Sequence, residues 1–141
     1  MRQDGRALLL VLMLVLLLGG AAGAHFAFFR SRADTAPPEV TYQLTLSGLV
    51  INLADSDKPH YVSTSLSLII AGRNPEEVVA EREAHIRDAV LMVVSRHTYR
   101  ELLSVEGKEG LKRDLAAAVT EVLAEHALRV EEVLFTDFVM E

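Results

Sequence analysis

Near its N-terminus the chain has a stretch of 23 residues, 7–29, that contains no Asp, Glu, Lys or Arg. Within it, residues 8–18 are all Leu, Val or Met. As an α-helix, such a stretch is about 34 Å long, enough to cross a hydrocarbon core of about 30 Å. Aromatic residues Phe26, Phe28 and Phe29 precede Arg30, as in an interfacial belt. The sequence therefore predicts one transmembrane helix over 7–29.

A cleavable signal peptide is the competing interpretation of the same stretch. Arg2 and Arg6 would form its charged region, and 22–24 an A-x-A cleavage site. Cleavage would leave the aromatic residues of 25–29 at an exposed terminus, so we expect an uncleaved anchor. The slight excess of Arg on its N-terminal side predicts a cytoplasmic tail over 1–6. A linker over 30–40 and a domain over 41–141 follow.

The composition of the remaining chain limits its function. About 100 residues suffice for one small domain. From residue 31 onward there are 11 Lys and Arg against 19 Asp and Glu, a net charge of −8. This balance argues against a nucleic-acid partner. Cys is absent, which excludes disulfides, thiolate metal sites and a Cys nucleophile.

Two strands and a turn are predicted at the start of the domain. Apolar residues alternate over 42–53, and the parity changes at Gly48, as in a β-bulge. A second strand over 61–70 has Val, Leu and Ile on one face and Ser63, Ser65 and Ser67 on the other. Asp, Ser, Lys and Pro over 55–59 are turn residues, so the two strands should form an antiparallel hairpin.

Two long helices and a third strand follow in the prediction. Asn74 as N-cap, Pro75 at the first position and Glu77 reaching back predict a helix to about residue 95. Residues 98–103 could add one or two helical turns, and Ser104 should cap a helix to about residue 127. The last strand, about 130–140, alternates poorly, so we expect an interior strand covered on both faces. The predicted fold is α+β, in the order β-β-α-α-β, with the helices on one face of a small sheet.

No arrangement of residues with catalytic chemistry stands out. His25, His60, His85, His97 and His126 are scattered, and only Glu81 and His85 have ligand-like spacing, which favours a surface pair over a metal site. Residues 107–110 lack the spacing of a phosphate-binding loop and read as a helix start. The sequence predicts no enzyme, no metal and no cofactor.

Six short motifs, each weak alone, occur in order along the domain. They are LVINLAD (49–55), YV (61–62), IRDAV (86–90), HTYREL (97–102), EGKEGLK (106–112) and VLFTDFV (133–139). In this order and spacing the chain resembles the FliL family of bacterial flagellar basal-body-associated proteins. The match covers residues 42–140.

The resemblance implies a single-pass inner-membrane protein with a periplasmic domain over 41–141 and a fold like the stomatin and prohibitin domain. It implies a non-enzymatic motor protein that forms rings, lies beside stator subunits of the MotA/MotB type in the basal body, and supports flagellar rotation. The motif positions, with structural or partner-binding roles, are Asn52, Arg87, Asp88, Thr98, Tyr99, Gly107, Phe135, Thr136 and Phe138.

Two departures from the family pattern leave an alternative open. The linker is short for such proteins, which puts in doubt an arm that docks on the stator plug, and the tail over 1–6 is too short for a cytoplasmic partner. The alternative is a membrane-tethered periplasmic scaffolding or binding module, a divergent paralogue with no part in motility. A secreted domain is a third possibility, if cleavage occurs after Ala24.

Overall fold

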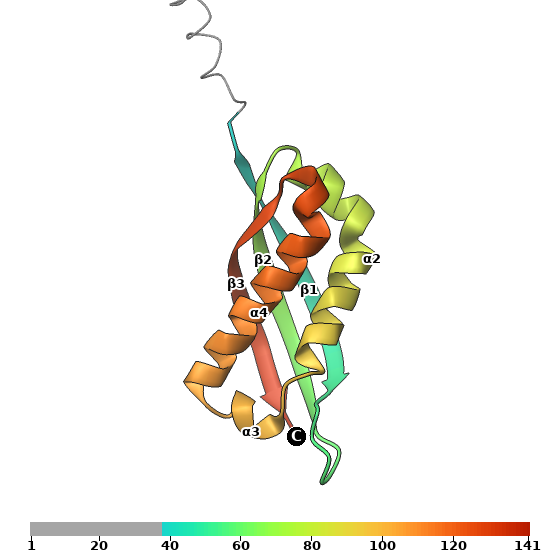
Figure 1. Ribbon diagram of the computed structural model, residues 1–141, viewed down its shortest axis with the longest axis vertical. Helices are drawn as coiled ribbons and strands as arrows, with labels where there is room; N and C mark the ends of the chain where they lie inside the picture. The colour runs from blue at the N-terminus through green and yellow to red at the C-terminus, as the bar shows by residue number, and fades with distance from the viewer. Residues whose placement is uncertain (1–37) are drawn as a thin grey trace, which may run out of the picture. The chain divides into compact units, whose positions relative to one another are not determined.

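The computed structural model describes residues 38–141, which form an α+β unit with a three-stranded antiparallel sheet in the order β1-β2-β3. Figure 1 labels the strands and helices. The elements are β1 (Val40–Asn52), β2 (Tyr61–Gly72), α2 (Pro75–Val94), α3 (Tyr99–Leu102), α4 (Val105–Leu123), a 3-10 turn η1 (Ala124–His126) and β3 (Arg129–Met140). The cytoplasmic tail predicted over 1–6, the membrane helix predicted over 7–29 and most of the predicted linker lie outside the described residues. Within 38–141, no helix is long and apolar enough to cross a membrane.

The predicted hairpin of β1 and β2 is confirmed. The two strands pair antiparallel, and the register shifts between Leu46 and Leu49. Gly48 lies in this shift with a φ of 65°, which a residue without Cβ adopts without steric cost. The β-bulge therefore lies at the position that the change in apolar alternation predicted. It lets the apolar residues on both sides of it face the same core.

The helix α2 begins and ends close to the predicted residues, but its first turn differs. Pro75 occupies the first helical position, as expected. Asn74 precedes it in the left-handed region, with a φ of 48°, and its side chain makes no capping hydrogen bond. Asn74 is therefore the N-cap residue, as predicted, but the capping box expected of the Asn74 and Glu77 side chains is not formed. Asn tolerates the left-handed backbone that the tight turn out of β2 imposes.

The segment after α2 forms one helical turn, α3, followed by α4. Thr98 caps α3 and Ser104 caps α4, and Ser104 is the residue that the sequence indicated. The helix α4 ends at Leu123, and a 3-10 turn then continues to His126. Ala127 has a φ of 53° and closes this end of the helix before β3 begins.

The prediction of an interior last strand is wrong, because β3 is an edge strand and β2 is central. The register between β2 and β3 shifts between Ser65 and Leu66 and again between Ile69 and Ile70. Each shift reverses the side of the sheet that the next residue faces. The even-numbered residues of β2 from 62 to 70 face the core, and the β3 residues opposite them are Val130, Val133, Phe135, Phe138 and Met140. The weak alternation thus reflects two bulges, and the opposite face of β3 leaves Leu134 and Val139 exposed.

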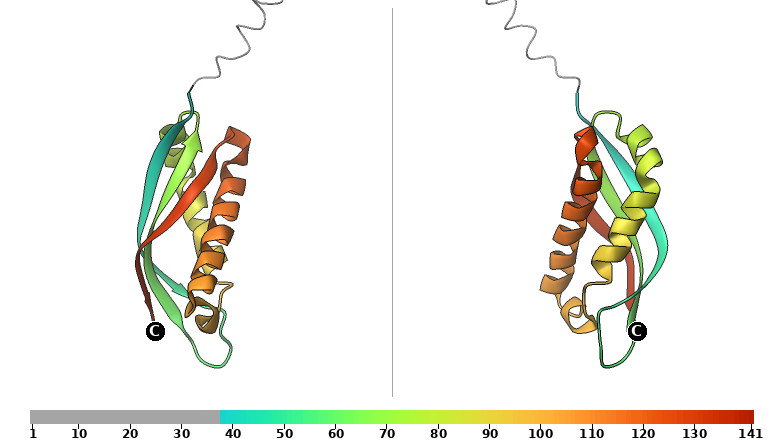
Figure 2. Two further views of the ribbon diagram at one scale, coloured as in Figure 1. Left: turned by 90° about the vertical axis from the view of Figure 1, so that its left-hand side faces the viewer. Right: turned by 45° about the vertical axis from the view of Figure 1, so that its right-hand side comes forward.

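In the described part of the chain, the helices cover one face of the sheet, as expected, and no helix lies over the other face (Figure 2). The core between the two layers consists almost entirely of Leu, Ile and Val side chains. Fully buried members include Leu46 of β1, Leu66 and Leu68 of β2, Ile86 of α2 and Leu115 of α4. Among residues 38–141, no aromatic side chain is a fully buried member of this core, and the aromatic motif residues Tyr99, Phe135 and Phe138 pack against its edge.

Candidate interaction site at the junction of α2, α3 and α4

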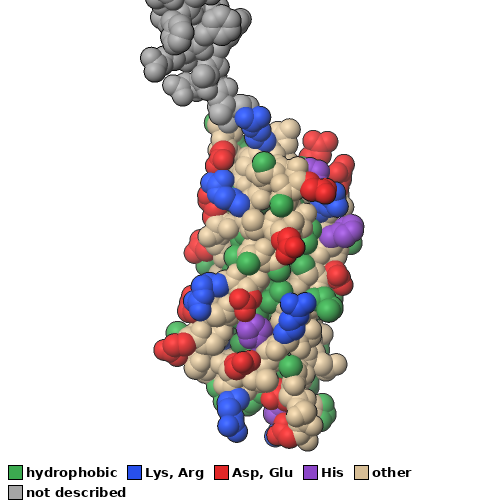
Figure 3. All heavy atoms as spheres, viewed as in Figure 1, with side chains coloured by type: hydrophobic (Ala, Val, Ile, Leu, Met, Phe, Trp, Pro, Cys, Tyr) green, Lys and Arg blue, Asp and Glu red, His purple; other side chains and the backbone are tan. Residues whose placement is uncertain are grey.

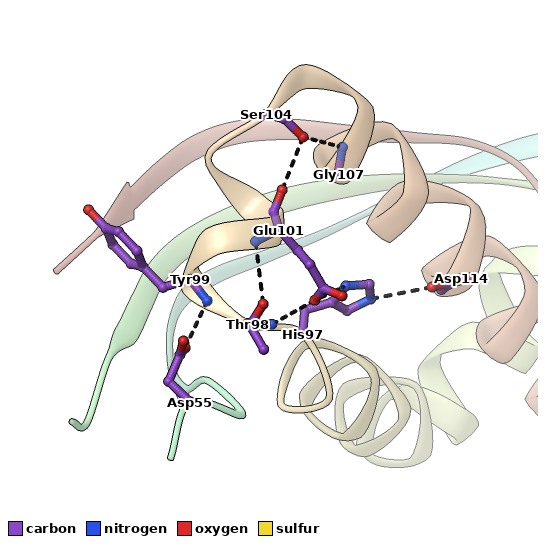
Figure 4. A network of polar contacts seen from close by, with 8 residues as sticks. All are labelled: Asp55, His97, Thr98, Tyr99, Glu101, Ser104, Gly107 and Asp114. Atoms are coloured by element: carbon purple, nitrogen blue, oxygen red, sulfur yellow. Dashed lines mark hydrogen bonds and ion pairs between the residues drawn. The ribbon is translucent and has the colours of Figure 1, made fainter. Parts of the chain in front are cut away.

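The polar site of greatest interest lies where α2 ends and α3 and α4 begin (Figure 4). Thr98 and Glu101 form a reciprocal capping box there. The Thr98 N–H donates to Glu101 Oε2 at 2.8 Å, and the Glu101 N–H donates to Thr98 Oγ1 at 3.3 Å. The T-x-x-E spacing of 98–101 is a known signature of this cap and would have identified it from the sequence. The cap fixes α3 although the helix is only four residues long.

His97 lies between two carboxylates that belong to different helices. Its Nδ1 is 3.7 Å from Glu101 Oε2, and its Nε2 is 3.3 Å from Asp114 Oδ2 of α4. The hydrogen bonds from Thr98, together with the nearby imidazole, hold the pKa of Glu101 below its usual value despite some desolvation. The carboxylate of Glu101 therefore stays ionised over a wider pH range. It joins the cap of α3 to His97.

The loop between β1 and β2 is tied to the same junction. The Tyr99 N–H donates to Asp55 Oδ2 at 2.7 Å, and the Ala54 N–H donates to the His97 carbonyl at 2.9 Å. The ring of Tyr99 stacks on His60, with centroids 4.2 Å apart. Asp55 and His60 come from a loop more than 35 residues earlier in the chain, so only the tertiary fold reveals these contacts.

Gly107 allows α3 and α4 to meet closely. The Ser104 hydroxyl donates to the Glu101 carbonyl at 3.1 Å and accepts the Gly107 N–H at 2.9 Å. A Cβ on Gly107 would lie 1.9 Å from the Glu101 carbonyl oxygen, well inside contact distance. Glycine is therefore required at this position because there is no space for a side chain, and not because of its backbone conformation.

Aromatic motif residues on β3 contact lysines of α4 in a second cluster. The rings of Phe135 and Phe138 are tilted at 60° with centroids 4.9 Å apart, and both are half-buried. The Nζ of Lys108 is 5.6 Å from the centroid of Phe138, and that of Lys112 is 5.9 Å from the centroid of Phe135. Such cation–π contacts help to hold the edge strand against the helix.

The other motif positions lie apart from both clusters. Asn52 is exposed at the end of β1, and Thr136 is exposed at a bulge of β3. On α2, Arg87 forms an ion pair with Glu83 at 3.6 Å, and Asp88 is exposed. The structure thus brings together Thr98, Tyr99 and Gly107. Asp55, His60, His97 and Glu101, which sequence reasoning did not single out as site residues, complete the junction.

A shallow depression of about 300 Å³ lies beside the junction, between α2 and α4. Apolar side chains and side chains of both charges line it: Val93, Arg96, His97, Asp114, Ala117, Ala118 and Glu121. Within residues 38–141, no three His, Asp or Glu side chains gather as metal ligands would. The contacts of the junction are those that hold helices and a loop in place, which suits a rigid docking surface.

Comparisons with known proteins agree with the motifs. A family model described as "Flagellar basal body-associated protein FliL" matches residues 44–140. The chain is also similar to the "Flagellar protein FliL" of Aquifex aeolicus (strain VF5), with 34% identity over 107 residues. That similarity covers 75% of this chain and 65% of the relative, so the chain spans just under two thirds of its length. The family match includes β3 and all three helices, and the chain therefore belongs to the FliL family of flagellar basal body-associated proteins.

Proposed function

We propose that this chain is a non-enzymatic accessory protein of the bacterial flagellar motor, anchored in the inner membrane by residues 7–29. Its domain self-associates in the periplasm beside stator subunits and supports flagellar rotation. The observation that carries this proposal is the family match over 44–140, which includes nearly every residue of the sheet and the helices. The match concerns the whole architecture of the domain, as expected for a protein that acts through its surfaces.

The roles of the motif residues support a scaffolding function. Thr98 caps a helix, Tyr99 holds the β1–β2 loop, and Gly107 provides space for two helices to meet. Each contact limits the movement of one element against another, and none leaves a reactive group poised over a deep cavity. A domain built in this way presents rigid surfaces to a partner at low entropic cost.

The membrane anchor contributes to assembly by raising the local concentration. The described residues carry ten Lys and Arg against eighteen Asp and Glu, so copies of the domain repel one another in solution. Figure 3 shows both signs of charge mixed over the side covered by the helices. Tethering to one membrane raises the effective concentration, which turns weak contacts into assembly without new interactions.

Motility tests the flagellar role directly. We expect a strain that lacks this chain to spread less in soft agar, and a plasmid copy to restore spreading. A frameshifted plasmid copy is the matched control. Full spreading of the deletion strain, with normal filaments, would contradict a role in the motor and favour the paralogue hypothesis.

Cysteine crosslinking tests self-association and the stator contact. The chain has no natural Cys, so single replacements at Ser63 or Ser65 of β2, Glu83 of α2 and Arg113 of α4 report on separate faces. We expect ladders of self-crosslinks in membranes and at least one adduct with a stator subunit. If well-expressed variants on all faces gave neither product in motile cells, the scaffolding function would have to be abandoned.

A reporter tests the topology. An enzyme that is active only in the cytoplasm, fused after Glu141, should stay inactive if residues 41–141 are periplasmic. The same reporter fused before Met1 should be active. Strong activity of the C-terminal fusion would reverse the proposed orientation.

A further inference from the structure

The free edge of β1 lacks the usual protection of an edge strand. Within residues 38–141, β1 pairs with β2 on one side and with no strand on the other. Its thirteen residues contain no charge and no Pro. Proteins usually protect exposed edges with charges, Pro, bulges or covering elements, because unpaired backbone groups invite another strand. The single bulge at Gly48 still leaves seven regular residues, 40–46.

The opposite edge of the same sheet is protected. β3 carries Arg129, Glu131, Glu132 and Asp137 and has two register shifts, each of which bends the strand. One row across the sheet shows the contrast, because Gln43 of β1 and Glu132 of β3 both lie opposite Ile69 of β2. The two edges differ in kind, which indicates that only β1 is suited to accept a strand.

The charge of the domain restricts which surfaces can meet when two copies associate. Neither β1 nor β2 has a charged residue, whereas α2, α4 and β3 each carry several acids. A contact between two acidic surfaces is opposed by repulsion, and like charges opposite each other in a strand pair are destabilising. A contact of β1 with β1 avoids both costs. The sequence of residues 40–46, VTYQLTL, is rich in residues that favour strand pairing.

We infer that β1 is a homotypic pairing edge, at which residues 40–46 of one copy pair antiparallel with residues 40–46 of a second copy. The two sheets then join into one of six strands, with a two-fold axis at Gln43. This register pairs all seven residues and places Thr41 opposite Thr45 of the other copy. The inference rests on the proposed self-association and specifies one of its contacts.

Single-Cys variants of the full chain in membranes test both the pairing and its register. Directly opposed residues of an antiparallel pair have Cα atoms about 4.5–5.5 Å apart, within disulfide range. We expect Gln43→Cys alone to form a disulfide-linked dimer. Thr41→Cys or Thr45→Cys alone should give little disulfide-linked dimer, because the same residue of the two copies is then about 14 Å apart along the strands. Co-expression of these two variants should restore the dimer. Glu132→Cys and Leu134→Cys on β3 are the matched controls and should give none.

A charge at the axis provides a second measurement. Gln43 is exposed, so Gln43→Glu should leave the fold intact and place two carboxylates opposite each other. We expect this variant to lower by at least fivefold the yield of a dimer trapped between Thr41→Cys and Thr45→Cys. Gln43→Ser, which stays neutral, should retain most of the yield. Equal yields from the charged and neutral variants would contradict a pairing through this edge.

The outcomes separate this inference from the proposed function. A dimer at Gln43, or at Thr41 or Thr45 with the axis shifted by two residues, supports the β1 contact. If β1 positions give no product while Ser63, Glu83 or Arg113 positions give ladders, the β1 contact is wrong and self-association stands. If no position on any face gives a product, both fail.

Discussion

Replacement of Gly107 by Ala tests whether the junction of α3 and α4 depends on close contact. The added Cβ would lie 1.9 Å from the Glu101 carbonyl oxygen, 2.7 Å from its carbon and 3.1 Å from Ser104 Oγ. All three atoms belong to a short segment that caps both helices. Relief of the first contact requires a movement of about 1 Å, and that movement would disturb the bond from the Gly107 N–H to Ser104.

The expected change in the free energy of unfolding is the sum of opposing contributions. Overpacking costs about 1–3 kcal/mol, and a weakened N-cap costs about 1 kcal/mol more. The better helix propensity of Ala returns about 1 kcal/mol. We expect a net loss of about 2 kcal/mol, which for a domain of about 100 residues lowers Tm by roughly 8–16 °C. Thermal unfolding of the purified chain, followed by circular dichroism, measures the change.

Gly110 provides the matched control in the same helix. A Cβ there would meet only the end of the Arg113 side chain, at 3.7 Å. Gly110→Ala should therefore stabilise the domain by up to about 1 kcal/mol. If the two variants shifted Tm in the same direction, the close contact at Gly107 would not control the stability of the junction.

Three further substitutions test other parts of the structure by the same unfolding measurements. Phe135→Ala should cost about 2 kcal/mol, roughly half of the 3–5 kcal/mol expected of a buried Phe, because Phe135 is half-buried on an edge strand; a loss above 4 kcal/mol would contradict this position. Glu101, whose pKa is lowered in the folded chain, contributes stability that is present above its unfolded pKa of about 4.5 and is lost as the pH falls through the lower folded value. Glu101→Gln should therefore destabilise the domain at pH 7 and reduce the loss of stability that occurs below pH 4.5. An unchanged dependence of the unfolding free energy on pH would argue against the capping box. Asp55→Ala should cost about 1–2 kcal/mol and speed amide hydrogen exchange at Tyr99, whose N–H loses its acceptor, whereas unchanged exchange would show that this bond is not formed in solution.

Local sequence patterns determined the hairpin, the bulge and the starts of the two long helices. The parity change at Gly48 and the residues Pro75 and Ser104 act within a few residues of themselves, so the sequence contains all that is needed to predict them. The family of the chain also followed from motifs that lie in order along it. Of the candidate site, the sequence supplied Thr98, Tyr99 and Gly107 as motif positions but not their roles.

The choice of the central strand and the assembly of the site depend on contacts between residues that are distant in the sequence. Weak alternation in β3 has two physical causes, burial on both faces or bulges in the register, and only pairing with β2 distinguishes them. The junction depends on Asp55 and His60 meeting Tyr99, more than 35 residues later in the chain, which no local period encodes. Likewise, the absence of charge in β1 is visible in the sequence, but its significance depends on the strand lying at an edge. Local interactions therefore determined the helices and strands and the starts of the two long helices, whereas contacts between distant residues determined the order of the strands in the sheet, the site and the free edge.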